Sequence, residues 1–155
     1  PTLEYAREWV LDVTPGPHAT PEYLDEQDLT TLFATDWQVD RNANRTGVRL
    51  EARRLQWART SGGIAGGHPS NILDNGYPLG GVNLNGDTPV ILAPDGPTAG
   101  GFVIVAVVCH ASPWKLGQLG PGTGTGRLNL ITIDEAQSRG EALDRRITES
   151  LAEIG

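Results

Sequence analysis

The sequence predicts a mainly β protein, a β-barrel or sandwich with a short helix near its N-terminus and a longer one at its C-terminus. Three observations support this. The 155 residues include 20 glycines and 11 prolines, which indicates many turns. Several short runs are rich in β-branched and aromatic residues, as strands are. Only two stretches have helical apolar spacing. The length suits one domain, so we expect residues 1–155 to form a single barrel domain, with residues 134–155 as a helical extension.

The N-terminal third contains strand and helix signals in turn. Val10, Leu11 and Val13 predict an opening strand, and a turn follows at residues 14–18. Residues 21–33 predict a short helix, because apolar side chains recur at 29, 32 and 33 and acids in the first turns suit the helix dipole. Two strands are then expected at residues 36–39 and 48–51, on either side of a polar connection.

Residues 61–102 form the stretch around which the chain is organised. Glycine, proline, asparagine and aspartate dominate it, so it cannot be a helix. It also carries more polar side chains than a flexible tether would. Tight turns and short strands remain, and binding residues tend to lie on loops of this kind. The site is therefore expected here.

The second half contains the strongest strands. Residues 90–92 and 102–108 are β-branched and apolar, and the second run predicts a central strand covered on both faces. Residues 112–119 predict a turn or single helical stretch, and the glycine-rich residues 120–126 a connection, since no phosphate-binding motif follows. A last strand is expected at residues 128–133. The C-terminal helix then follows to Ile154, with Asp134 as its N-cap and one apolar face, formed by Leu143, Ile147, Leu151 and Ile154, that docks or pairs.

Composition excludes several classes of function. The net charge is −7, and the basic cluster of Arg49, Arg53, Arg54 and Arg59 is interleaved with Glu51. We interpret that cluster as a solvated face, and expect neither nucleic acid nor a membrane as partner. Cys109 is the only cysteine, which favours the cytoplasm. The chain begins without methionine, so we expect a piece of a longer protein.

Residues 68–74 bring together the side chains best suited to chemistry. They hold a base, a hydroxyl, an amide and a carboxylate in His68, Ser70, Asn71 and Asp74. A hydrolase triad uses the same types, but no nucleophile-elbow motif is present. A metal site formed by His18, His68 and His110 with Asp74 or Asp95 lacks close ligand spacing. The plain alternative is a turn in which Asn71 and Asp74 bond their own backbone.

Two further groups of residues are candidate functional sites. Residues 95–101 (D-G-P-T-A-G-G) join two strong strands, and Gly100 and Gly101 could bring their backbone N–H groups close to a ligand oxygen. This segment could equally be a plain strand connection. Lys115 beside Trp114 is the third candidate, with the alternative that Trp114 is core and Lys115 extends to solvent.

Five segments in a fixed order resemble a known family. They are residues 16–24 (GPHATPEYL), 35–50 (TDWQVDRNANRTGVRL), 61–74 (SGGIAGGHPSNILD), 86–102 (GDTPVILAPDGPTAGGF) and 114–119 (WKLGQL). Together they resemble the carboxyltransferase domain of urea carboxylase, the biotin-dependent part of urea amidolyase, within the wider allophanate hydrolase subunit 2-like family. The resemblance covers roughly residues 15–136, and the H-P-S-N segment favours urea carboxylase. The chain departs from the family pattern at residues 120–128.

The resemblance implies a fold and a chemistry. The chain resembles the second half of the first lobe of that domain, a cyclophilin-like β-barrel. The implied reaction moves a carboxyl group from N-carboxybiotin to urea, giving allophanate. Biotin would be carried on a separate carrier domain, and ATP would be used only in a biotin carboxylase domain outside this chain. The other half and the second lobe of the carboxyltransferase domain would be further partners, and the isolated piece is expected to be inactive.

The resemblance and the motifs together give the candidate site. The predicted catalytic residues are His68, Asp95 and Lys115, and no metal is expected. The predicted substrate-binding residues are Ser70, Asn71, Asp74, Asn83, Thr98, Gly100 and Gly101. The alternatives left open are a non-catalytic interaction module of the same fold, and a related carboxyltransferase or amidohydrolase for guanidine, 5-oxoproline or allophanate.

Overall fold

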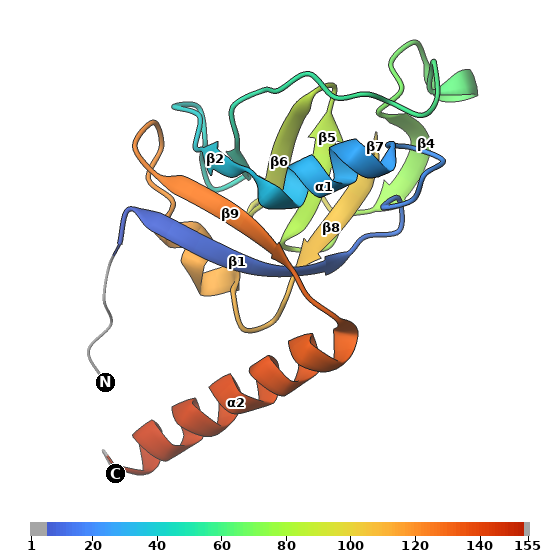
Figure 1. Ribbon diagram of the computed structural model, residues 1–155. Coiled ribbons are helices and arrows are strands. Elements are labelled where there is room, and N and C mark those ends of the chain that lie inside the picture. The colour runs from blue at the N-terminus through green and yellow to red at the C-terminus, as the bar shows by residue number, and fades with distance from the viewer. Residues whose placement is uncertain (1–5, 154–155) are drawn as a thin grey trace.

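A computed structural model describes residues 6–153. In chain order its elements are β1 (Glu8–Pro15), α1 (Glu26–Ala34), β2 (Asp36–Gln38), β3 (Gly47–Arg49), the 3-10 helix η1 (Gly63–Ala65), β4 (Asn71–Gly76), β5 (Gly81–Asn85), β6 (Thr88–Leu92), β7 (Ala99–Phe102), β8 (Ile104–Val108), the 3-10 helix η2 (Pro113–Gln118), β9 (Thr125–Leu130) and α2 (Ile133–Ala152). The mainly β prediction is confirmed, and Figure 1 shows the strands wrapped around one centre with α2 running away below them.

Seven strands form one curled sheet in the order β2-β9-β1-β8-β5-β6-β3. Its two edge strands meet again, since Val39, just after β2, forms an antiparallel bridge with Leu50, just after β3. Two backbone hydrogen bonds of 2.9 Å flank the bridge, from Asp40 N–H to the Arg49 carbonyl and from Glu51 N–H to the Gln38 carbonyl. The sheet therefore closes on itself at this one bridge, in the manner of a barrel.

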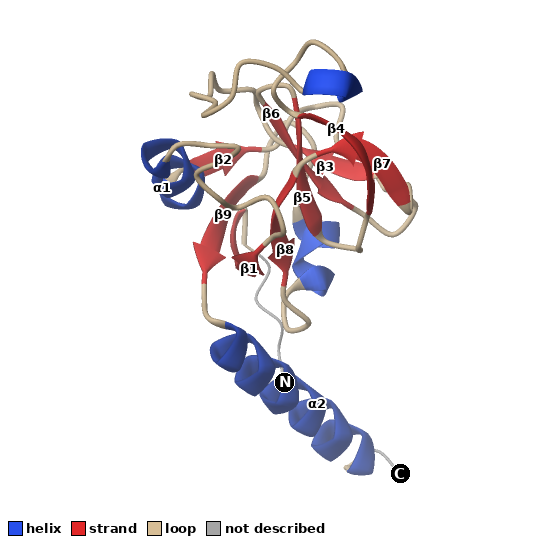
Figure 2. Cartoon of the chain, turned by 90° about the vertical axis from the view of Figure 1, so that its right-hand side faces the viewer, coloured by secondary structure: helices blue, strands red, loops and turns tan. Residues whose placement is uncertain are grey.

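The core fills the inside of this curled sheet. Its fully buried members come from strands far apart in the sequence, including Leu11, Val13, Val82, Leu84, Ile91, Val105 and Leu128. Strand β8 lies between β1 and β5 and is nearly all buried, which confirms the central strand predicted from its apolar run. That run is divided, however: Phe102 belongs to β7, which pairs with β4 in a separate two-stranded sheet. Figure 2 shows this β4–β7 pair beside the main sheet.

Several predicted boundaries were wrong. Helix α1 begins at Glu26 rather than at residue 21, because Leu24 is buried in a bridge with Trp57 and Asp25 is the N-cap. Strand β9 covers residues 125–130 rather than 128–133. Helix α2 is capped by Thr132 rather than Asp134, through a capping box in which Thr132 and Glu135 satisfy each other's backbone N–H.

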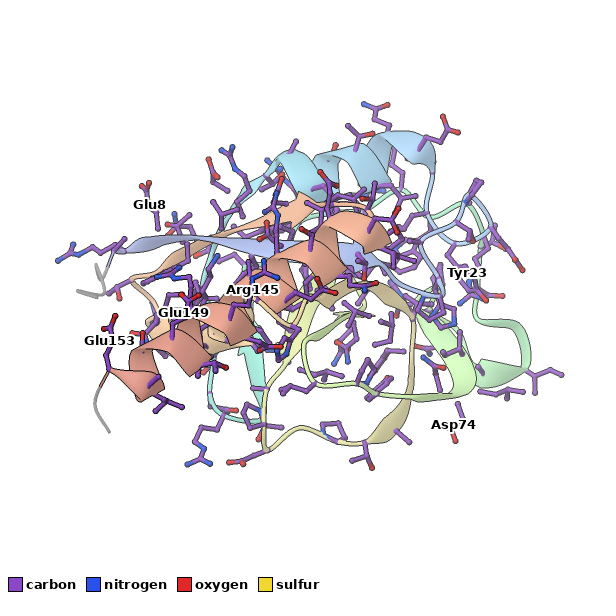
Figure 3. The ribbon with its side chains drawn as sticks, turned by 90° about the horizontal axis from the view of Figure 1, so that it is seen from below. Glu8, Tyr23, Asp74, Arg145, Glu149 and Glu153 are labelled. Carbon is purple, nitrogen blue, oxygen red and sulfur yellow. The ribbon has the colours of Figure 1, made fainter. Side chains whose placement is uncertain are left out.

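Helix α2 is anchored to the rest of the chain through Arg139, Gly140 and Asp144, the last of which lies 3.0 Å from His110 Nε2. Arg139 pairs with Asp12 of β1 at 2.7 Å, and Gly140 packs against the His110 ring. Further along, Ile147 and Leu151 are 49% and 65% exposed, so the predicted apolar face is only partly docked; Ile154 lies outside the described residues. Seen from below in Figure 3, α2 crosses beneath β1 with Arg145, Glu149 and Glu153 along its length.

Candidate functional site

The turn before β4 holds His68 and Ser70 together. The Ser70 hydroxyl lies 2.9 Å from His68 Nδ1, and the Ser70 backbone N–H donates to the same nitrogen at 3.1 Å. Because Nδ1 accepts from a backbone N–H, the neutral ring carries its proton on Nε2. His68 is exposed, so Nε2–H is free to donate to a ligand.

The buried side chain of Ser70 holds His68 in place. Its side chain is fully buried, and its oxygen accepts a hydrogen bond of 3.1 Å from the backbone N–H of Gly86 in the β5–β6 turn. The single hydroxyl hydrogen has two possible acceptors, His68 Nδ1 at 2.9 Å and the more distant Asn71 Oδ1 at 3.4 Å. A hydroxyl buried and bonded in this way orients its neighbours, and this geometry does not suit an attacking nucleophile.

Asn71 begins β4 beneath the glycine-rich turn of residues 61–67. A Cβ atom on Gly62 would lie 2.8 Å from Asn71 Cβ, and one on Gly66 would lie 3.2 Å from Asn71 Nδ2. Gly66 also has a φ of 117°, a backbone conformation that L side chains rarely adopt. Glycine at these two positions therefore lets the turn close over the Asn71 amide, which stays half-buried.

Arg59 also holds the segment from Pro69 to Asn71 in place. Its guanidinium donates to the carbonyl oxygens of Pro69 and Asn71, both at 2.7 Å, and lies 4.4 Å from the centre of the Tyr23 ring. The Tyr23 ring in turn meets His18 edge-on at 4.9 Å. The interpretation of Arg59 as part of a solvated face was therefore wrong. Its partners are carbonyls and a ring that composition does not reveal.

His18 has a structural role beside Tyr23. Its Nδ1 accepts a hydrogen bond of 2.9 Å from the Ile104 backbone N–H. Burial, the largest influence, lowers the pKa of His18, and the charge of Arg59 acts in the same direction. A neutral imidazole is therefore favoured here, which keeps a second positive charge away from Arg59.

Trp57 is a second residue that sequence reasoning missed. Its ring lies edge-on to the His68 ring at 5.6 Å, and its Nε1 donates to Asp87 at 3.1 Å. The indole thus fixes one side of the His68 ring to the β5–β6 turn. We call His68, Ser70 and Asn71, with Arg59 and Trp57 around them, the histidine cluster.

A second group of predicted residues lines a groove on the outer face of β3, β6 and β5. The groove has a volume of about 450 Å³, and all four residues of β7 line it. Asn83, Gly100 and Gly101 lie in it, together with Tyr77 and Phe102. Asn85 lines the same groove and precedes Gly86, which bonds Ser70, so the groove and the histidine cluster adjoin at one turn.

Tyr77 is one of the residues that line this groove. Its hydroxyl accepts from the Phe102 N–H at 2.7 Å and donates to the Phe102 carbonyl at 3.3 Å. Burial raises the pKa of Tyr77, so the phenol stays protonated. A Cβ on Gly100 would lie 2.6 Å from the ring, which explains why glycine is found at that position.

The remaining predicted residues neither line the groove nor belong to the histidine cluster. Asp95 forms an exposed ion pair of 2.9 Å with Arg45, and Thr98 is exposed with its carbonyl accepting from Tyr77 N–H. Asp74 is exposed, and Figure 3 shows it at the margin of the molecule. Lys115 donates to the Val10 carbonyl at 2.7 Å, beside β1. The three predicted catalytic residues therefore share no contact.

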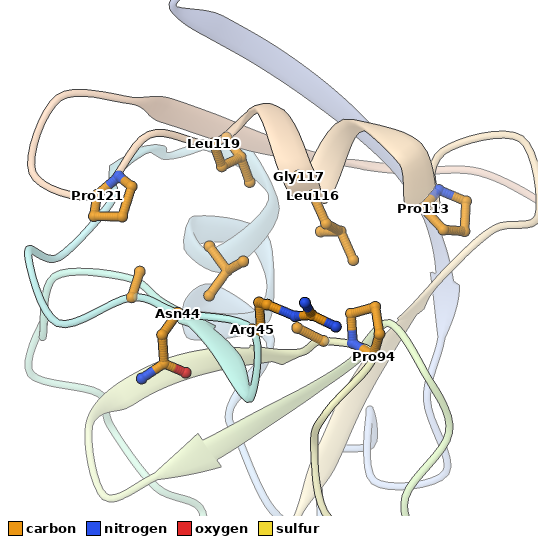
Figure 4. A pocket seen from close by; sticks show the side chains of 11 residues that line it. Asn44, Arg45, Pro94, Pro113, Leu116, Gly117, Leu119 and Pro121 are labelled. Carbon is orange, nitrogen blue, oxygen red and sulfur yellow. The ribbon is translucent and has the colours of Figure 1, made fainter.

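A smaller cavity of about 290 Å³ lies at the end of the curled sheet (Figure 4). Proline and aliphatic side chains line it, and Arg45 is its one titratable residue. Across residues 6–153, no three His, Cys, Asp or Glu side chains are grouped so as to hold a metal ion. None of the helices described there is long and apolar enough to cross a membrane.

A curled β sheet that carries imidazole and amide side chains on glycine-rich turns is suited to bind a small polar molecule. The family described as "Carboxyltransferase domain, subdomain A and B" matches residues 1–126, and the chain belongs to this family.

Its relatives include enzymes of urea metabolism. The chain is 46% identical over 122 residues to the urea amidolyase of Saccharomyces cerevisiae, covering 79% of this chain and 7% of that protein. It is 40% identical over 119 residues to a putative urea carboxylase of Emericella nidulans, covering 77% and 10%. The crystal structure of Kluyveromyces lactis urea carboxylase is 44% identical with a TM-score of 0.88, covering 95% of this chain and 13% of that one. The chain thus spans about a tenth of these relatives.

Proposed function

We propose that this chain is part of a biotin-dependent carboxyltransferase that moves a carboxyl group from N-carboxybiotin to a nitrogen of urea, giving allophanate. Its similarity to urea amidolyase and urea carboxylase supports the proposal. Because the chain spans so little of those proteins, the rest of the carboxyltransferase domain, a biotin carrier domain and an ATP-using domain would complete the enzyme. A cytoplasmic location, favoured by the single cysteine, belongs to the same proposal.

The histidine cluster is the observation that carries this proposal. Urea is neutral and planar, with one carbonyl acceptor and two amino groups. Asn71 offers both a donor and an acceptor, and His68 offers Nε2–H, so the two can bind such a molecule without a net charge. In the proposed reaction His68 donates to the urea oxygen, which becomes more negative as the attacking nitrogen loses its proton.

Biotin, when bound, supplies the carboxyl group and takes up the proton that urea loses. The residues of this chain then have to orient urea and hold the developing charge. Ser70 keeps His68 in the required tautomer, and Arg59 fixes the backbone on both sides of Ser70. Asp95 and Lys115 have no contact with this cluster, so we assign the catalytic contribution to His68 alone.

A chimera tests the proposal. The matching segment of K. lactis urea carboxylase is replaced by residues 6–126 of this chain, and allophanate formation from ATP, bicarbonate and urea is measured. The chimera should form allophanate, and His68→Ala in the chimera should lower kcat/KM at least a hundredfold, as loss of a placed donor to a developing oxyanion does. Asp74→Asn, at an exposed site outside the cluster, is the matched control and should have no effect. The isolated chain should form no allophanate.

Two results would count against the proposal. A folded chimera that makes no allophanate would rule out urea carboxylation as the function of this chain. Full activity of the His68→Ala chimera would support the reaction but show that its active site is not the histidine cluster.

A further inference from the structure

A two-residue turn joins β5 to β6 beside the histidine cluster. Asn85 at the end of β5 pairs with Thr88 at the start of β6, so Gly86 and Asp87 form the turn. Gly86 has a φ of 60°, a conformation that a tight hairpin turn requires at its first residue and that glycine adopts without strain. The carbonyl oxygen of Asp87 accepts a hydrogen bond of 3.1 Å from the Arg53 N–H. The backbone of the turn is therefore fixed at both of its residues.

Both residues of this turn act on the His68 ring, each through another residue. The Gly86 N–H donates to the Ser70 hydroxyl oxygen at 3.1 Å, and that oxygen lies 2.9 Å from His68 Nδ1. The Asp87 carboxylate accepts a hydrogen bond of 3.1 Å from Trp57 Nε1. The indole in turn meets the imidazole at 86°, with 5.6 Å between the ring centres. One route thus holds the ring at Nδ1, and the other holds the indole beside it.

The orientation of the Trp57 indole depends on Asp87. Nε1–H is the only group of an indole that donates a hydrogen bond, and Asp87 is its acceptor here. Trp57 is partly buried against the core, but the last side-chain torsion of tryptophan has a broad, roughly two-fold preference. The hydrogen bond selects one of these orientations. Without the acceptor the indole would turn in part of the molecules, and its contact with His68 would be lost there.

We propose that Asp87 is a positioning residue for His68. It holds the Trp57 indole in the orientation that confines the imidazole, and so keeps His68 Nε2–H directed at the substrate. An indole N–H is neutral and needs only an acceptor, so this role depends on the side-chain oxygen of residue 87 and not on its negative charge. The inference rests on the proposed function, in which Nε2–H donates to the urea oxygen, and Asp87 acts there only through Trp57.

NMR spectroscopy of the isolated chain tests the positioning directly. The indole ring current displaces the signals of the His68 ring protons from those of a free histidine, because the two rings are in contact. Asp87→Ala should reduce this displacement, and Asp87→Asn, which keeps an acceptor oxygen, should restore it. Asp40→Ala is the matched control, since Asp40 accepts hydrogen bonds from Asn42 outside the histidine cluster. An unchanged displacement in Asp87→Ala, or no recovery in Asp87→Asn, overturns the proposal.

Kinetics of the chimera measure the consequence for the proposed reaction. Asp87→Ala should lower kcat by about tenfold to a hundredfold with little change in KM, because a misplaced donor chiefly loses its contact with the developing charge. Trp57→Phe keeps an aromatic ring but cannot donate, so it should have the same effect. The double variant should lose no more than either single variant, since both changes remove one hydrogen bond. Additive losses, or an equal loss in Asp40→Ala, contradict the proposal. If Asp87→Ala does not fold, Trp57→Phe tests the same bond with Asp87 in place.

The two experiments separate this inference from the proposed function. If the chimera forms no allophanate, urea carboxylation is ruled out, and the NMR comparison on the isolated chain still decides whether Asp87 positions His68. If the chimera is active and Asp87→Ala is as active as the parent chimera, the proposed function stands and Asp87 has no positioning role.

Discussion

The guanidinium of Arg59 donates a hydrogen bond of 2.7 Å to the main-chain carbonyl oxygen of Asn71. The same guanidinium bonds the carbonyl of Pro69, so one side chain holds the backbone on both sides of Ser70. It also packs on the ring of Tyr23, a residue 36 positions earlier in the chain (59 − 23 = 36). Arg59 thereby connects the segment before α1 to the first residue of β4, and it positions the histidine cluster without itself contacting His68 or the Ser70 side chain.

Arg59→Ala should therefore destabilise the chain. Loss of its hydrogen bonds is expected to cost about 1.5–3 kcal/mol, which lowers Tm by about 3–12 °C for a protein of this size. Thermal unfolding followed by circular dichroism measures this. Arg54→Ala is the matched control, because Arg54 is exposed and makes no side-chain hydrogen bond within residues 6–153. Equal Tm values for the two variants would show that Arg59 is the solvated residue that its sequence context indicates.

The difference between the two interpretations of Arg59 shows what sequence can and cannot reveal. Local signals located most elements: the apolar run ending at Val108 predicted the central strand β8, and the glycine content predicted turns. The partners of Arg59 are backbone carbonyls and a distant ring, which leave no mark on local composition. The same holds for the groove, where Arg49, Val90 and Asn83 come together only through the register of three strands.

The starts of the two α-helices differ in how well local sequence predicts them. The sequence analysis predicted Asp134 as the N-cap, and the Thr132-to-Glu135 spacing of a capping box was the signal that it missed. The start of α1 had no such local signal. Leu24 leaves the helical pattern because it is buried in a bridge with Trp57, a contact between residues far apart in the sequence. Tertiary contacts decided that boundary.

Gly100→Ala should destabilise the β4–β7 pair. The new Cβ would lie 2.6 Å from the Tyr77 ring, which cannot easily move because its hydroxyl is bonded to Phe102. Overpacking of this kind costs about 1–3 kcal/mol, which is a fall in Tm of about 2–12 °C. Gly76→Ala, in the same strand pair, is the control, since a Cβ there meets nothing within 4 Å. A fall in Tm for Gly76→Ala as large as that for Gly100→Ala would contradict the steric explanation.

The attachment of α2 should depend on pH through Asp12. Burial, the strongest single influence, raises the pKa of Asp12, but the hydrogen bonds from Asn129 and Arg139 and the charges of Arg139 and Lys115 together hold it below its usual 3.8. Since the folded-state pKa is the lower one, the ionised carboxylate contributes stability that is fully present above about pH 4. That contribution is lost as the pH falls through the folded-state pKa.

Asp12→Asn isolates this effect. At pH 7 the variant should have a lower Tm than the parent chain, and the difference should shrink as the pH is lowered through 4 towards 3. Asp74→Asn, at an exposed acid, should show no such convergence. A Tm difference between Asp12→Asn and the parent that stays constant from pH 7 to pH 3 would remove Asp12 as the source of the pH dependence.

Asn71 should decide between urea and guanidine in the proposed reaction. An asparagine amide both donates to and accepts from neutral urea, whereas guanidinium is a cation with donors only. A carboxylate in place of the amide would pair with guanidinium through charge-assisted bonds worth roughly 1.5–3 kcal/mol. Asn71→Asp in the chimera should therefore raise the ratio of kcat/KM for guanidine over urea by about tenfold to a hundredfold.

The alternative is that Asn71 only supports its own turn. Aspartate serves in such turns as well as asparagine does, so Asn71→Asp would then keep the fold and leave the ratio unchanged. Asp74→Asn three residues later is the matched control, and should change neither substrate's kcat/KM. The ratio of the two kcat/KM values is the decisive quantity, because a general loss of stability lowers both values and leaves the ratio unaltered. A raised ratio therefore places the side chain at position 71 at or beside the substrate.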